Sequence, residues 1–253
     1  MELAFLAAAA FLAGLIDAVA GGGGLVQIPA LFSAYPNLSP ATLIGTNKVA
    51  AMSGTAAAAW RYGRRVRVYW GATGPAIVAA FLFSMLGAYV LTLIPADPLR
   101  KALPFVLLLL LGSTVAKKNL GTEHAPTLSG LAERWAAIGV GVVIGFYDGI
   151  FGPGTGSFLM IAFVRIFGYD FLHASVSTKF VNLATNLAAL LLLAAKGHIW
   201  WQLGLIMAVG NVAGSQVGSR LALKHGSGFV RKVFIFVVLA LILKTAYDAF
   251  LLG

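Results

Sequence analysis

Two stretches of this sequence repeat each other at a constant offset of 131 residues. In the first, an apolar run carries the single acid Asp17, breaks at a cluster of glycines, and is followed by a second apolar run and then Lys48. Asp148 lies 131 residues after Asp17, and Lys179 lies 131 residues after Lys48. The same offset relates further identical pairs: Gly14 and Gly145, Trp70 and Trp201, Ser84 and Ser215, Gly87 and Gly218. The chain therefore consists of two copies of one unit, with a first repeat at 1–116, an inter-repeat loop at 117–134 and a second repeat at 135–253.

Composition places these repeats in a membrane. Of the 253 residues, 60% are hydrophobic and only 10% are charged, and the mean hydropathy is +0.91. Soluble domains carry about 25% charged residues, and several apolar runs reach the roughly 20 residues of a transmembrane helix. We predict an all-α, multi-pass protein of the inner (plasma) membrane. The net charge of +10 is interpreted as loop charge that sets membrane orientation, not as a nucleic-acid surface.

Metal and thiol chemistry find little support in the sequence. The chain has no cysteine, which excludes disulfides and cysteine-ligated metals. The four histidines lie far apart, without the spacing of a metal site; they are His124, His173, His198 and His225. We expect neither a bound metal nor a cofactor.

The expected helices follow from the apolar runs and from the glycine, proline and N-cap residues that bound them. They are 2–20, 25–35, Pro40 to Trp60 or Tyr62, 69–94 and 99–116 in the first repeat, and 135–151, 157–168, 171–195, 200–223 and 229–252 in the second. Ser39 and Asp170 occupy equivalent N-cap positions. The run 25–35 would be only about 16 Å long, too short for a bilayer core of about 30 Å. Each repeat thus contains one helix broken by glycine, plus three transmembrane helices.

The distribution of loop charge favours inverted repeats. If each glycine-broken segment is a hairpin that returns to its own side, eleven lysine and arginine residues lie on one side and three on the other. If each segment crosses once, the division is eight against six. Because positive loop residues gather on the cytoplasmic side, we predict hairpins, an inverted second repeat and both termini outside. The length of 2–20, which could span alone, argues for the alternative of a full crossing.

The buried charges and the glycine breaks together predict an anion site between the repeats. Lys48 lies nine residues after Ser39, about 13 Å along its helix and near the midplane, where a charged group costs about 2.5–3.5 kcal/mol to insert. Broken-helix tips present free N–H groups and a positive dipole end to anions. The predicted substrate-binding residues are Gly21, Gly22, Gly23, Gly24, Asn47, Lys48, Gly152, Gly154, Thr155, Gly156, Ser177, Thr178, Lys179 and Asn182, with Asp17 and Asp148 as coupling or charge-balancing groups.

A purely structural interpretation of the same charges stays open. Asp17 could pair with Lys48, and Asp148 with Lys179, as buried ion pairs without a transport role. On this interpretation the glycines serve helix packing. Asn186 and Asn211 are interpreted as interhelical hydrogen-bonding groups.

The motifs resemble those of the TauE/SafE family of sulfite and organosulfonate exporters, also called toluene-sulfonate uptake permeases. The resemblance rests on G-L-I-D-A-V-A-G-G-G-G at 14–24 with G-T-N-K at 45–48, and on G-F-Y-D-G-I-F-G-P-G-T-G at 145–156 with S-T-K-F-V-N at 177–182. It implies secondary transport of a small sulfur-containing anion without nucleotide or metal.

The expected function is therefore a secondary transporter, with export the expected direction, for an anion such as sulfite or an organosulfonate. Alternating access would occur around the midplane site, with the anion, the lipid bilayer and optionally a second copy of the chain as partners. The alternatives are a non-transporting membrane scaffold and an intramembrane enzyme. The sequence offers no Gly-x-Ser-x-Gly elbow, histidine pair or acid cluster for an enzyme.

Overall fold

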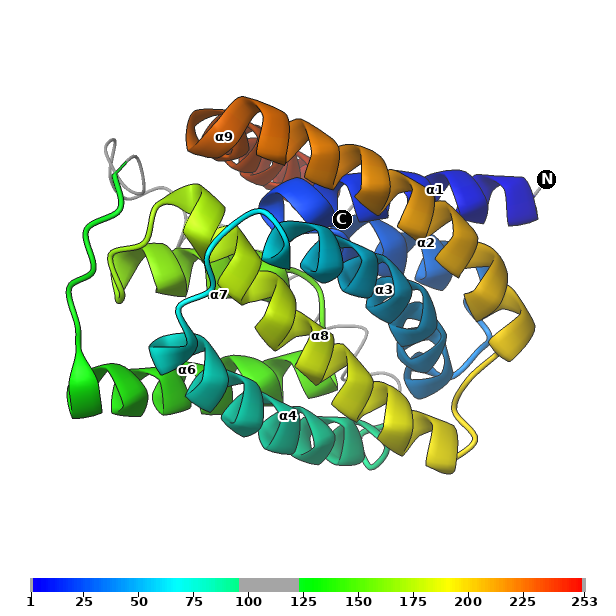
Figure 1. The fold of residues 1–253 in the computed structure, drawn as a ribbon. Helices are drawn as coiled ribbons and strands as arrows, with labels where there is room; N and C mark the ends of the chain where they lie inside the picture. Colours follow the sequence, from blue (N-terminus) through cyan, green and yellow to red (C-terminus); the bar gives the residue numbers. More distant parts are fainter. Residues whose placement is uncertain (1, 96–122, 252–253) are drawn as a thin grey trace.

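The structure, a computed structural model, describes residues 2–95 and 123–251, and these residues form helices and no strands (Figure 1). The helices are α1 (Glu2–Ala20), α2 (Gly24–Ala34), α3 (Pro40–Gly63), α4 (Trp70–Leu91), α6 (Gly130–Ile150), α7 (Thr155–Arg165), α8 (Phe171–Ala195) and α9 (Trp201–Leu251). Within the described chain, α1, α4, α6 and α8 are long and apolar enough to cross a membrane. The all-α membrane prediction is confirmed. The expected helix 99–116 lies outside the described residues.

The helix boundaries follow the sequence signals closely. Ser39 Oγ accepts a hydrogen bond from the Thr42 N–H at 3.2 Å, and Asp170 Oδ1 accepts one from the Leu172 N–H at 2.7 Å. Both predicted N-caps are thereby confirmed. The helices expected at 200–223 and 229–252 appear as one element, α9, which bends at Gly226 with φ 72° and ψ −169°. Only glycine adopts this conformation readily, so the expected interruption survives as a kink.

The helices of the two copies pack against each other in corresponding pairs. The packing of α4 along α6 has its counterpart in the packing of α9 along α1. Two buried hydrogen bonds repeat in the same way: Ser84 Oγ donates to the Thr185 carbonyl at 2.9 Å, and Ser215 Oγ donates to the Gly54 carbonyl at 2.6 Å. Exchanging residues by the offset of 131 converts one bond into the other. The contacts therefore show the same two-fold relation as the sequence.

Glycines let these helix pairs approach closely. A Cβ atom added at Gly145 would lie 2.6 Å from the Ala80 carbonyl oxygen, and one at Gly14 would clash with the backbone of Asn211, the residue equivalent to Ala80. Small residues at crossing points are typical of helix pairs in membranes. They fix α1 against α9 and α6 against α4, and so hold the broken segments in place.

The two broken segments are hairpins that enter the bundle from opposite ends. In Figure 1 the chain enters α1 and leaves α2 at the right of the view, whereas it enters α6 and leaves α7 at the left. The short helices α2 and α7, of 11 residues each, are the returning arms. This is the arrangement that the loop-charge argument favours. The placement of both termini outside the cell stays a prediction.

Candidate functional site

Two ion pairs join the repeats at the centre of the bundle. Lys48 Nζ lies 2.6 Å from Asp148 Oδ2 and 3.2 Å from the Asp148 carbonyl oxygen. Lys179 Nζ lies 2.9 Å from Asp17 Oδ2 and also donates to the Asp17 carbonyl. The lysine side chains are 1% and 0% exposed, and those of Asp148 and Asp17 are 2% and 15% exposed. Lys48 of α3 therefore pairs with the acid near the end of α6, and Lys179 of α8 pairs with the acid near the end of α1. Each ion pair joins one repeat to the long arm of the other repeat's hairpin.

Both ion pairs form between the repeats, so the within-repeat pairs of the structural interpretation are wrong. Asp17 pairs with Lys179 instead of Lys48, and Asp148 pairs with Lys48 instead of Lys179. The physical reason is helix packing, because the long arm of each hairpin packs along a helix of the other repeat, α6 along α4 and α1 along α9, and so brings its acid to the lysine of that repeat. Sequence distance gives no sign of this exchange.

Glycine at the second break makes room for the lysine. Gly152 has φ 84°, and a Cβ atom on it would lie only 3.2 Å from Lys48 Nζ. The chain therefore turns directly after Asp148 and passes close to the ammonium group. A side chain at this position would be strained in backbone conformation and crowded against the ion pair.

The two glycine breaks contact each other. Gly21, with φ 76°, packs backbone to backbone on Gly156, and a Cβ atom at either residue would clash with the other. Ser157 Oγ donates to the Ala20 carbonyl at 3.1 Å, which ties the first turn of α7 to the end of α1. The breaks thus form one joint between the repeats.

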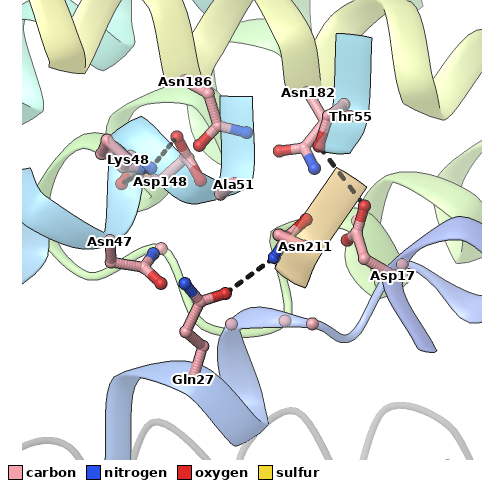
Figure 2. Close-up of a pocket in the computed structure, with 16 residues that line it drawn as sticks. Asp17, Gln27, Asn47, Lys48, Ala51, Thr55, Asp148, Asn182, Asn186 and Asn211 are labelled. Atoms are coloured by element: carbon pink, nitrogen blue, oxygen red, sulfur yellow. Dashed lines mark hydrogen bonds and ion pairs between the residues drawn. The ribbon is translucent and has the colours of Figure 1, made fainter. Parts of the chain in front are cut away.

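A small polar cavity is lined by residues of this joint and of both ion pairs, and Figure 2 shows the polar side chains in its wall. Its volume is about 20 Å³, which is room for about one water molecule. Eleven residues predicted from the sequence line it: Asp17, Gly21, Gly23, Gly24, Asn47, Lys48, Asp148, Gly152, Gly154, Gly156 and Asn182.

Five predicted residues lie beside the cavity instead of in its wall. Thr155 Oγ1 donates to the Gly152 carbonyl at 2.9 Å within the turn, and Ser177 Oγ accepts from Thr73 Oγ1 of α4 at 2.9 Å. Lys179 reaches the cavity only through Asp17. The remaining two, Gly22 and Thr178, are buried nearby.

Five further residues line the cavity and were not predicted as site residues: Gln27, Ala51, Thr55, Asn186 and Asn211. Asn211 Nδ2 donates to Gln27 Oε1 at 2.8 Å, so its predicted interhelical hydrogen bond is confirmed, although it also faces the cavity. Asn186 follows Asn182 by one helical turn, and Thr55 is its counterpart in the first repeat. The i, i+4 spacing and the repeat offset could have identified both.

The cavity wall combines balanced charge with unpaired amide groups. Its two carboxylates are matched by the two ammonium groups that bond to them, so the fully ionised set carries no net charge. Gln27 Nε2 and Asn47 Oδ1 have no hydrogen-bond partner among the described residues. Buried polar groups without partners are rare in native proteins, and a bound water or ligand in the cavity would satisfy these two.

A second polar cluster lies at the start of α8. The histidines looked scattered in the sequence, but the fold brings the rings of His124 and His173 to a centroid distance of 4.3 Å beside Asp170. Spacing along the chain could not reveal this cluster because His124 belongs to the inter-repeat segment.

Comparison with known proteins finds similarity over nearly the whole chain. Residues 6–245 match the family described as "Sulfite exporter TauE/SafE". The chain is 37% identical to "Probable membrane transporter protein ORF9" of Sinorhizobium sp, over 97% of this chain and 93% of the relative. It is 36% identical to "Probable membrane transporter protein YfcA" of Escherichia coli K12, over 95% of this chain and 88% of the relative. A "Probable membrane transporter protein" of Haemophilus influenzae is 33% identical, over 97% and 95% of the two chains.

No solved structure matches the chain. The family match covers both repeats, including both glycine breaks and both buried lysines. This protein belongs to the TauE/SafE sulfite exporter family.

Proposed function

We propose that this protein is a secondary transporter that exports a small oxyanion such as sulfite or an organosulfonate across the inner membrane. The observation that carries this proposal is the pair of buried lysine–aspartate bridges that cross between the repeats at a polar cavity. Ionisable groups buried within a membrane protein mark substrate and ion pathways. Transporters built from two related repeats bind their substrates at the interface of those repeats.

The charge balance of the site indicates how an anion would enter. Each ammonium group already faces a carboxylate, so neither lysine offers a free positive charge to a substrate in this conformation. Protonation of Asp148 would leave Lys48 with an uncompensated charge, and an anion would then restore neutrality. The proposed cycle therefore couples one substrate anion to a proton taken up by an aspartate.

Amide groups supply the remaining contacts. Gln27 Nε2, which has no hydrogen-bond partner among the described residues, lies at the cavity, whose wall also includes Asn47, Asn182 and Asn186. Hydrogen bonds from neutral donors to a charged oxygen contribute about 1.5–3 kcal/mol each. This donor set suits an oxyanion with several oxygens better than a monatomic ion.

The size of the cavity implies movement. A volume of about 20 Å³ admits a water molecule but not a sulfonate group. On this proposal the structure would be the closed stage of the cycle, and substrate would enter when one repeat rocks against the other at the Gly21–Gly156 joint. Because the ion pairs cross between repeats, breaking and remaking them would accompany this motion.

Flux measurements in proteoliposomes test the proposal. Purified protein should move sulfite or a small organosulfonate faster than protein-free liposomes do, and a pH gradient should change the rate. The double variant Lys48→Met with Asp148→Asn is the matched control, because it removes the charge pair together and should reconstitute without flux. Absence of flux for sulfite, sulfate, thiosulfate and sulfonates, in either direction, would refute the proposal.

A further inference from the structure

We propose that His124, Asp170 and His173 form a binding site for a divalent transition-metal ion of the zinc class. The three side chains come from the inter-repeat segment, the N-cap of α8 and its first turn, and one ligand atom from each lies within 4.8 Å of the others. Two imidazoles and one carboxylate are a ligand set that Zn²⁺ uses where a fourth position stays open to water. This site lies apart from the cavity between the repeats and does not depend on the proposed transport function.

The carboxylate is already oriented for a ligand. Asp170 Oδ1 accepts hydrogen bonds from the Leu172 N–H at 2.7 Å, the His173 N–H at 2.9 Å and Ser227 Oγ at 2.9 Å. These donors fix the carboxylate and leave Oδ2 to face the two imidazoles. Secondary hydrogen bonds of this kind orient metal ligands and are a regular part of metal sites.

A purely structural role does not account for the buried position of His124. His173 Nδ1 lies 2.6 Å from Asp170 Oδ2, and this hydrogen bond accounts for its position. Both ring nitrogens of His124 are shielded from solvent and have no hydrogen-bond partner among the described residues; its Nδ1 lies 3.8 Å from Asp170 Oδ2. A bound ion would satisfy one of these nitrogens.

The surroundings keep the His124 ring in place. Its ring stacks on Tyr69 at 4.7 Å between centroids, and Tyr169 lies 5.3 Å away.

The bound ion would link segments that are distant in the sequence. Backbone hydrogen bonds already hold the inter-repeat segment near this point, from the Ala125 N–H to the Gly168 carbonyl at 2.9 Å and from the Thr127 N–H to the Phe167 carbonyl at 3.2 Å. Ser227, at the bend of α9, contacts the same carboxylate. A metal here would fasten the inter-repeat segment and the α9 bend to the start of α8, the helix that carries Lys179.

Titration of the purified full-length chain tests the site, after removal of any affinity tag and treatment with chelator. Zn²⁺ should bind at one ion per chain by calorimetry, and Co²⁺ should develop the visible absorption of a low-symmetry nitrogen–oxygen site. Mg²⁺ should not compete, because imidazole ligands favour transition metals. Zn²⁺ should also raise the midpoint of thermal unfolding of the wild type.

Two variants decide the outcome. His124→Ala and Asp170→Asn should each weaken Zn²⁺ binding at least about tenfold. Asparagine keeps the N-cap, and the His124 ring makes no hydrogen bond to the described residues whose loss would destabilise the fold. His198→Ala and His225→Ala, which change histidines outside the cluster, should bind Zn²⁺ as the wild type does. Equal Zn²⁺ affinity in the wild type and in His124→Ala, or no binding by the wild type, would overturn the proposal.

Discussion

The crossed ion pair between Lys48 and Asp148 gives the sharpest prediction. Its N–O distance is 2.6 Å and its side chains are 1% and 2% exposed, so the energies of buried pairs apply and not the roughly 0–1 kcal/mol of surface pairs. Removing one partner of a buried pair costs about 3–5 kcal/mol. For a chain of this size about 1 kcal/mol shifts the unfolding midpoint by roughly 2–4 °C. Lys48→Met should therefore lower the midpoint by about 6–20 °C.

A second substitution should restore the stability only if it removes the correct acid. Lys48→Met with Asp148→Asn leaves no unpaired charge, so its midpoint should return most of the way to that of the wild type. Lys48→Met with Asp17→Asn leaves Asp148 and Lys179 both unpaired, so it should be less stable than either single variant. Unfolding of the detergent-solubilised protein, followed by tryptophan fluorescence, measures the wild type, the single variants Lys48→Met and Asp17→Asn, and the two double variants. Rescue by Asp17→Asn, without rescue by Asp148→Asn, would refute the crossed pairing.

Three further predictions follow from the joint, the cavity and the loop charges. Gly21→Ala should destabilise the protein by at least about 2 kcal/mol, because the residue has φ 76° and packs on the Gly156 backbone. Gly22→Ala should be tolerated in the same unfolding assay, since its nearest neighbours are side-chain atoms at 3.3 Å or more. Gln27→Leu should fold but lower the proteoliposome flux about tenfold or more, as expected for one lost hydrogen bond to an anion; unchanged flux would remove Gln27 from the site. Reporter fusions after Lys118 should indicate a cytoplasmic location and fusions at the C-terminus a periplasmic one, whereas a cytoplasmic result for both would contradict inverted repeats.

Local sequence signals predicted the helices and the residues at the centre well. The Ser39 N-cap and the glycine breaks can be identified from residues that are adjacent in the sequence. The repeat offset of 131 can be found by aligning the sequence with itself. The structure has α2 and α7 at equivalent positions, and most of the predicted site residues line one cavity.

Features that depend on the three-dimensional crossing of the repeats could not be predicted in the same way. The partner of Lys48 is Asp148 because α6, which carries Asp148, packs along α4 of the first repeat, and no distance along the chain encodes that choice. The approach of His124 to His173 likewise requires the inter-repeat segment to return to the start of α8. The position of Ser177 also depends on helix packing, because its hydroxyl accepts a hydrogen bond from Thr73 of α4 instead of lining the cavity.

Accessibility of the cavity during transport tests the central claim most directly. The chain has no cysteine, so Ala51→Cys places a single thiol in the cavity wall. In oriented proteoliposomes a membrane-impermeant maleimide should modify this thiol from either side, and a transported organosulfonate should slow the reaction from both sides. The closed conformation described above would then be one stage of an alternating cycle. Modification from one side only, at a rate that no transported anion changes, would contradict a substrate site between the repeats.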